Sequence, residues 1–293
     1  MNWEPEMPLS HILVPVDFSE KSECAARYAA ALHRRFGSHI TLLHVLPPPH
    51  YEFGAMEVGG SVLEELFRSR AEQARQDLDA FLRDELPPEN VERMLVEGDP
   101  AARIVRTAHE LGVSLIVMPT HGYGTFRRFI LGSVTAKVLH DADCPVWTGV
   151  HMEAARVDDV RLDRIAVGLD LRSQSERTLM WARRFAQEVG AEMALLHVMP
   201  GLGAAGELSE PEWKQRMEDS ARREIASLMA RLGWEAPVLI GSGEVPETVC
   251  KLAREWGANL LVIGRGSASG VLGRLRANAY SIIRQSSCPV VSV

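Results

Sequence analysis

The chain contains one sequence pattern twice. Residues 11–17 (HILVPVD) are matched by 164–170 (RIAVGLD), and residues 41–45 (TLLHV) by 194–198 (ALLHV), both 153 positions later. Further pairs follow in the same order, at separations of 145 or 144: 98–104 with 243–249, 114–118 with 259–263, and 144–146 with 288–290. Since 293 residues exceed what a single hydrophobic core usually fills, the repetition predicts two similar domains in tandem.

Each repeat alternates short apolar runs with longer amphipathic stretches, which is the pattern of β-α-β units on a parallel sheet. The apolar runs are nearly continuous in Val, Ile and Leu, as expected when helices cover both faces of the sheet. We therefore predict two tandem doubly wound α/β domains, residues 1–152 and 160–293, each a five-stranded parallel sheet with helices on both faces. A polar linker is expected at about 151–160. The strands are expected at 11–16, 40–46, 91–96, 114–118, 145–149, 164–169, 193–198, 237–240, 259–263 and 289–293.

Charge and composition exclude several classes of protein. A formal charge of −7 and a pI near 5.8 provide no positive field that would attract nucleic acid or an anionic membrane. The first residues do not form a basic and then apolar leader, and no run of 18 apolar residues occurs, so we expect a cytoplasmic protein. The cysteines form no CxxC pair, so we expect no metal site and interpret them as small buried side chains. They are Cys24, Cys144, Cys250 and Cys288.

Two acidic residues and one loop follow strands of the predicted sheets. Ligands of doubly wound sheets bind outside the carboxyl ends of the strands, where the strand order reverses. Asp17 and Asp170 each end a first strand, and a loop begins at Pro119 after the fourth. Each aspartate is therefore either a ligand contact or a cap for the following helix. His44 and His197, inside apolar strands, are interpreted as satisfied structural residues rather than ligands.

The loop from Pro119 to Ser133 (PTHGYGTFRRFILGS) is the strongest candidate for a ligand site. It follows a strand and opens a helix, and its glycines let the backbone approach a ligand closely. Free N–H groups at a helix start, together with a serine hydroxyl, form a natural cradle for phosphate. Ser133 is expected to cap this helix, as Ser19 is expected to cap the first one. His121 and the two arginines at 127–128 lie in the same loop, where they could meet phosphate or form solvated surface.

The same loop resembles the motif of nucleotide-binding universal stress proteins, which is Gly, two residues, Gly, nine residues, Gly, then Ser or Thr. Gly122, Gly132 and Ser133 match this motif in spacing and identity. The opening ILVPVDFS, the LLHV strand and the CPV strand also resemble that family, so the resemblance covers nearly all of the first repeat. It implies a Rossmann-like, adenine nucleotide alpha hydrolase-like domain, dimeric or pseudo-dimeric packing through the last strand and, in one subclass, ATP binding.

The resemblance also implies which residues hold the nucleotide, which would be ATP with or without Mg²⁺. Asp17 would lie by the nucleoside, the Val45 backbone by the base, and the glycine-bounded turn by the ribose and phosphates. The full set in the first repeat is Pro15, Val16, Asp17, Val45, Pro119, His121, Gly122, Gly132, Ser133 and Val134. The candidates in the second repeat are Asp170, Val198, Gly264 and Gly266.

Both repeats also depart from the motif. Pro119 occupies the first glycine position, where it removes a backbone donor and fixes φ at about −65°. In the second repeat Gly264 matches, but Arg276-Ala277 stands where Gly-Ser belongs, so the phosphate cradle is expected to be lost there. Arg274 and Arg276 are then either side-chain contacts to an anion or solvated surface.

Two functions fit these observations. The first is a stress-response regulatory protein that binds ATP or a related adenine nucleotide in its first repeat, with the second repeat as a built-in dimer partner. The alternative is a nucleotide-free interaction scaffold that acts through its pairing surfaces. Since no Walker, HExxH or GxSxG motif occurs, we expect no enzymatic activity beyond weak ATP hydrolysis. The other expected associations are a pseudo-dimer of the repeats through strands 145–149 and 289–293, homodimerisation as an open alternative, and protein partners that the sequence does not identify.

Overall fold

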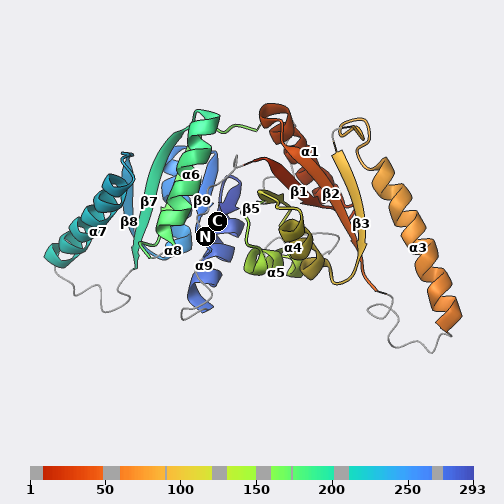
Figure 1. Ribbon diagram of the computed structural model, residues 1–293. Coiled ribbons are helices and arrows are strands. Elements are labelled where there is room, and N and C mark those ends of the chain that lie inside the picture. Colours follow the sequence, from red (N-terminus) through yellow and green to blue (C-terminus); the bar gives the residue numbers. More distant parts are fainter. Residues whose placement is uncertain are drawn as a thin grey trace. The chain divides into compact units, whose positions relative to one another are not determined.

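Within the described part of the chain, parallel strands form a five-stranded arrangement in each repeat, as predicted (Figure 1). The computed structural model describes residues 9–48, 60–89, 91–120, 131–149, 160–172, 174–200, 211–265 and 273–293. The chain divides into two compact units, Met1–Val160 and Arg161–Val293, each of which holds one repeat. The predicted linker falls almost wholly outside the described residues.

Strands and helices alternate along the first repeat. Its elements are β1 (His11–Pro15), α1 (Glu20–Phe36), β2 (His39–Leu46), α3 (Gly60–Ala80), β3 (Val91–Glu97), α4 (Pro100–Glu110), β4 (Leu115–Val117), α5 (Ser133–Asp141) and β5 (Val146–Thr148). Each predicted strand is confirmed, with its ends within one residue of the prediction. The continuous apolar runs predict where these strands begin and end, because each run has the length of a single buried strand.

The second repeat has the same order of elements. They are β6 (Arg164–Leu169), α6 (Ser175–Val189), β7 (Glu192–Pro200), α7 (Pro211–Arg231), β8 (Val238–Gly243), α8 (Val245–Trp256), β9 (Leu260–Ile263), α9 (Gly273–Gln285) and β10 (Val290–Ser292). The five predicted strands are again present, with β8 running three residues further than expected. The duplicated sequence therefore gives a duplicated fold.

In each repeat, later strands are added first on one side of the first strand and then on its other side. The order is β3-β2-β1-β4-β5 in the first repeat and β8-β7-β6-β9-β10 in the second, with all of the described pairs parallel. Crossovers between parallel strands are right-handed, so helices that lead outward on the two sides of β1 lie on opposite faces of the sheet. This confirms the doubly wound architecture, with its switch point between β1 and β4 and again between β6 and β9.

The central strands are buried on both faces of each sheet. Ile12, Leu13 and Val14 of β1 are each 0% exposed, although successive side chains point to opposite faces. The same holds in β6 for Ile165, Ala166 and Val167. Burial on both faces fixes the register of these strands and therefore the position of the loops that leave their carboxyl ends.

Local signals set where the helices begin and end. Ser19 caps α1 as predicted, because its hydroxyl accepts a hydrogen bond from the Ser22 N–H at 3.2 Å. That helix ends at Gly37, whose φ of 68° lies in the left-handed region that glycine adopts most easily. Asp99 caps α4 in the same manner, accepting from the Ala102 N–H at 2.9 Å. None of the described helices combines the length and apolar character that a membrane span requires.

The cysteine interpretation holds only in the second repeat. Cys250 and Cys288 are buried, and burial raises the pKa of the Cys288 thiol and raises that of Cys250 to about 11. Cys24 and Cys144 are half-buried, so the expectation of buried side chains is wrong there. Cys144 stands in the turn before β5. This turn is more exposed than the central strands of the sheet.

Replacing Leu42 by alanine should lower the free energy of unfolding by about 2–5 kcal/mol, because its fully buried side chain lies in β2 and its loss leaves a cavity. Urea denaturation followed by circular dichroism measures this. Leu66→Ala on α3 is the control, since Leu66 is 44% exposed and its truncation should change stability by less than about 0.5 kcal/mol. Equal losses in the two variants would contradict the assignment of the core.

Candidate functional site

A cavity of about 660 Å³ lies at the switch point of the first repeat. Its walls come from the carboxyl ends of β1, β2 and β4 and from the start of α5. Most residues that the sequence singles out line it: Pro15, Val16, Asp17, Val45, Pro119, Gly132, Ser133 and Val134. His121 and Gly122 lie outside the described residues. The topology thus brings segments 30 to 120 positions apart in the sequence to one opening.

Asp17 lines the cavity and also supports the turn into α1, whereas the cap of this helix is Ser19; a ligand contact of Asp17 stays a prediction. Its Oδ1 accepts hydrogen bonds from the backbone N–H and the hydroxyl of Ser19, at 3.1 and 2.5 Å. Ser19 in turn caps α1. Asp170 makes a related pair in the second repeat, accepting from the Arg172 N–H at 3.0 Å and from the Ser175 hydroxyl at 2.8 Å. Both carboxylates are therefore held in place before any ligand binds.

The residue after each aspartate has an unusual backbone conformation. Phe18 has a φ of 62° and Leu171 a φ of 56°, both in the left-handed region that side chains other than glycine and asparagine rarely adopt. Such residues persist where the surrounding structure holds them, and they concentrate at functional sites. The turn recurs in both repeats, directly after the aspartate that lines each cavity.

His44 is bound to the end of the neighbouring strand. Its Nδ1 lies 2.8 Å from the Val16 carbonyl oxygen, and its ring stacks on Phe18 at a centroid distance of 4.4 Å. Burial lowers the pKa of His44, although the Val16 carbonyl and Asp17 act in the opposite direction. The carbonyl oxygen can only accept, so Nδ1 carries the proton. His197 repeats this contact with the Leu169 carbonyl at 2.9 Å, so both rings have a structural partner, and both also line the cavity of their repeat.

The start of α5 faces the cavity with its backbone donors. Ser133, Val134 and Thr135 are the first three residues of the helix, so their N–H groups have no partner within it. The expectation that Ser133 caps the helix is wrong: Gly132 occupies the N-cap position and makes no side-chain bond there. The Gly132 N–H instead donates to the Thr120 carbonyl at 2.9 Å. A phosphate at this point would therefore meet main-chain amides rather than a capped helix end.

Pro119 lines the cavity without closing it. Its carbonyl oxygen accepts a hydrogen bond from the Thr135 hydroxyl at 3.1 Å, which ties the end of β4 to the first turn of α5. Pro119 has no N–H and so offers no backbone donor to a ligand. Its carbonyl oxygen instead makes a fixed contact between strand and helix. This geometry keeps the amides of α5 next to the carboxyl end of β4.

Arg70 is a lining residue that no sequence motif marks. It comes from α3, which packs against β2 and β3, and it is half-buried. Among the described residues around this cavity it is the only arginine or lysine. Its position on a long helix far from the glycine loop explains why sequence reasoning missed it, since only packing brings the two together.

The second repeat has a cavity of about 420 Å³ in the corresponding place. Asp170, Val198 and Gly264 line it, whereas Gly266 lies outside the described residues. A Cβ added at Gly264 would lie 2.9 Å from the Thr178 hydroxyl oxygen, so any larger residue here would have to displace the Thr178 side chain. The ends of the strands therefore form a similar floor in both repeats.

The helix that closes the second cavity begins earlier than expected. α9 starts at Gly273, which is 15 residues before Cys288, whereas α5 starts at Ser133, 11 residues before Cys144. Gly273-Arg274, and not Arg276-Ala277, therefore opens the last helix. Arg276-Ala277, which the sequence comparison places at the Gly-Ser position of the motif, lies inside this helix.

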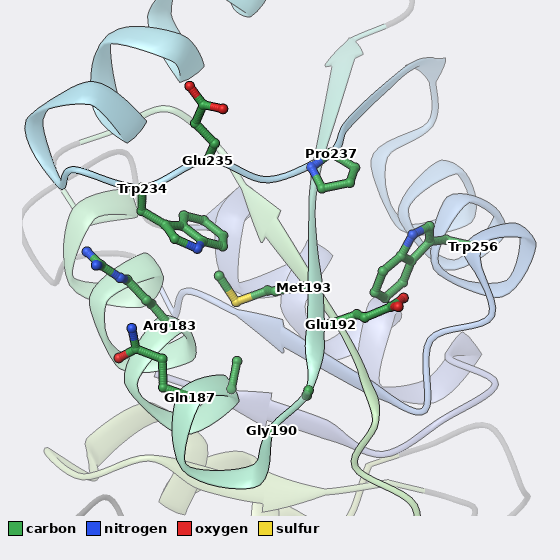
Figure 2. A pocket seen from close by; sticks show the side chains of 11 residues that line it. Arg183, Gln187, Gly190, Glu192, Met193, Trp234, Glu235, Pro237 and Trp256 are labelled. Atoms are coloured by element: carbon green, nitrogen blue, oxygen red, sulfur yellow. The ribbon is translucent and has the colours of Figure 1, made fainter.

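A third cavity, of about 510 Å³, lies at the other edge of the second sheet (Figure 2). Glu192 and Met193 at the start of β7 separate Trp234 from Trp256 there. Arg164 already covers the ring of Trp256 at 4.6 Å. This cavity is thus at the amino ends of the strands, away from the edge where doubly wound sheets bind ligands. In the described ranges, no group of three or more His, Cys, Asp or Glu side chains could hold a metal ion.

The sequence model of the universal stress protein family matches residues 8–148 and again residues 161–293. The chain belongs to the universal stress protein family. It is 28% identical over 300 residues to a universal stress protein of Mycolicibacterium smegmatis, which covers 96% of both chains. A universal stress protein of Thermus aquaticus is 32% identical over 137 residues, 46% of this chain and 94% of its own.

Solved universal stress proteins share the fold. A universal stress protein from Archaeoglobus fulgidus superposes with a TM-score of 0.69 at 23% identity, covering 97% of this chain and 98% of its own. A universal stress protein from Pseudomonas aeruginosa gives a TM-score of 0.63 at 17% identity. The fold is therefore common to this chain and to proteins of distant sequence.

Lowering the pH should destabilise this universal stress protein partly through His44. The folded chain resists protonation there, so below the ordinary histidine pKa of 6.5 the unfolded chain binds more protons and stability falls as the pH decreases. His44→Asn keeps a donor to the Val16 carbonyl and removes the titration, so the loss of stability between about pH 7.5 and pH 5 should become smaller. Urea denaturation across this range measures the slope. His11, whose pKa burial and His39 also lower, contributes with the same sign, so part of the slope persists.

An unchanged slope in His44→Asn would contradict the assignment of a half-buried neutral imidazole. Equal stability of the wild type and His44→Asn near pH 7.5 would show that the donor to the Val16 carbonyl is preserved.

Proposed function

We propose that this universal stress protein binds ATP or a closely related adenine nucleotide in its first repeat and acts as a regulator in the stress response. The observation that carries the proposal is the convergence of the first α5 amides with Asp17, Val45 and Pro119 on one cavity. Its volume of about 660 Å³ falls within the range of about 300–1,000 Å³ that small-molecule sites occupy. The resemblance to nucleotide-binding members supports an adenine nucleotide as the ligand.

The two ends of the cavity differ in chemistry in the way an adenine nucleotide requires. At the strand ends, the Asp17 carboxylate can accept hydrogen bonds from ribose hydroxyls, and the backbone near Val45 offers bonding groups to a base. At the helix end, the N–H groups of Ser133 and Val134 favour an anion. Mg²⁺, where it accompanies ATP, would be held by phosphate oxygens and water rather than by a protein cage.

Several finer expectations belong to the same proposal. The second repeat would act as an internal partner of the first, and the tandem chain could pair further as a homodimer. A cytoplasmic location and partner proteins stay predictions as well. An interaction scaffold without nucleotide is the alternative, and it gains support if purified protein binds no ATP.

Gly132→Arg should weaken ATP binding by at least about tenfold, because a long side chain at the N-cap would occupy the space next to the α5 amides. Its φ of −58° is accessible to any residue, so the variant should fold. Isothermal titration calorimetry measures the affinity. Gly273→Arg at the start of α9 is the matched control and should leave binding at the first repeat unchanged. No binding at about millimolar ATP in the wild type, or no loss in Gly132→Arg, rejects the proposal.

Arg70→Gln should weaken ATP binding by about tenfold and leave adenosine binding unchanged, because only ATP offers phosphate oxygens for a charge-assisted hydrogen bond. Arg68→Gln is the control on the same helix, since its side chain is 80% exposed and pairs with Glu64. Calorimetric titrations with both ligands separate the two effects. A parallel loss for ATP and adenosine would show that Arg70 shapes the cavity and does not contact phosphate.

A further inference from the structure

The cavity at the amino end of the second sheet reaches both faces of that sheet (Figure 2). Glu192 and Met193 are neighbours in β7, so their side chains point to opposite faces. Met193 lines the cavity on the side of Trp234, and Glu192 lines it on the side of Trp256. Arg164, which lies over the Trp256 ring, also pairs with Glu192 at 3.6 Å. The cavity therefore extends from one face of the sheet to the other at the start of β7.

The backbone of Met193 points into the space beside β7 where β8 has not yet begun. In a parallel ladder the N–H and the carbonyl of one residue point to the same side, and successive residues alternate. The Leu195 N–H donates to the Pro237 carbonyl at 2.9 Å, so Met193, two positions earlier, also points toward the β8 side. The pairing of β7 with β8 starts only at Leu195, opposite Val238. Met193 therefore lies just beyond the end of this ladder.

Proline at position 237 leaves both polar groups of the Met193 backbone without a partner strand. In the register of β7 and β8, the N–H that would reach the Met193 carbonyl belongs to residue 237, and proline has none. Within the described ranges, no other group bonds to the N–H or the carbonyl of Met193. Met193 is only 6% exposed, and buried backbone groups require a partner. That partner has to come from the cavity, which both Met193 and Pro237 line.

The Trp234 ring is held beside these groups by the turn that follows α7. Arg183 of α6 donates from Nη1 to the Leu232 carbonyl at 2.5 Å, and the Trp234 N–H donates to the Met229 carbonyl at 3.2 Å. Arg183, Trp234 and Met193 line the same side of the cavity (Figure 2). An indole offers a flat face on which another flat ring can stack. The stacking surface is therefore in position before any ligand binds.

We propose that this cavity binds a flat heterocyclic amide of one or two fused rings, in its uncharged form. A cyclic amide carries a carbonyl oxygen and an N–H on one edge, which accept from the Met193 N–H and donate to the Met193 carbonyl. Its ring lies against the indole of Trp234. The volume of about 510 Å³ falls within the range of about 300–1,000 Å³ that small-molecule sites occupy. This site does not depend on the nucleotide proposed for the first repeat.

Carbostyril, a two-ring cyclic amide, is the probe, and N-methylcarbostyril, which lacks the N–H, is its matched control. The full chain is labelled with nitrogen-15 methionine, and the Met193 amide signal is assigned by its loss in Met193→Leu. We expect carbostyril to shift the Met193 amide proton downfield, because that proton gains an acceptor. Carbostyril should also bind at least about tenfold more tightly than the N-methyl compound, which cannot donate to the Met193 carbonyl.

Two variants with controls test the walls of the site. Trp234→Leu should weaken carbostyril binding about tenfold, whereas Trp213→Leu on α7, where the ring is 50% exposed, should not. Pro237→Ala supplies an N–H in register with the Met193 carbonyl, so it should weaken binding about tenfold as well. Pro145→Ala is its control, because the Pro145 carbonyl also accepts from a strand N–H, but in the first repeat. Urea denaturation shows that each variant folds.

Three results would overturn the proposal. They are an unshifted Met193 signal at about millimolar carbostyril, equal affinity for the N-methyl compound, and full affinity in a folded Trp234→Leu or Pro237→Ala variant. Tighter binding of an extended peptide, N-acetyl-trialanine amide, would assign the open edge of β7 to strand pairing and would overturn it too.

Discussion

The reversal of strand order between β1 and β4 determines where this protein can bind a ligand. Chains leaving the carboxyl ends of these neighbouring strands go to opposite faces of the sheet, so no loop fills the space between them. Burial on both faces fixes the strands that border this space, as the fully buried Leu13 and Ile116 show. The cavity is therefore a consequence of topology, and the loops around it decide its chemistry.

Hydrogen bonds to main-chain atoms hold the walls of the cavity in place. The His44 ring bonds to the carbonyl of Val16, the Thr135 hydroxyl to the carbonyl of Pro119, and the Asp17 carboxylate to the N–H of Ser19. The first two bonds join neighbouring elements at the opening, and the third holds the turn between β1 and α1. A ligand therefore meets groups whose positions are already determined, so binding costs little further ordering of the walls.

The strands and their carboxyl ends could be predicted from the sequence, because a buried parallel strand is an apolar run whose last residue is easily located. Asp17 and Pro119 were found for that reason. Helix starts were harder: Ser133 can cap a helix or begin one, and the tertiary bond from Gly132 to Thr120 decides between the two. Arg70 had no local signal at all, since it reaches the cavity only through the packing of α3 on β2.

The same difference explains why the two repeats share their strand ends and differ in the length of their last helix. A strand end cannot move by one residue without turning buried side chains toward the opposite face of the sheet, so Asp17 and Asp170 keep equivalent places. A helix start is under no such constraint, because an added turn preserves the face that the helix buries. α9 has gained about one turn relative to α5 while Ile282 and Ile283 stay buried. The two repeats therefore share the end of the cavity that the strands form and differ in the length of the last helix.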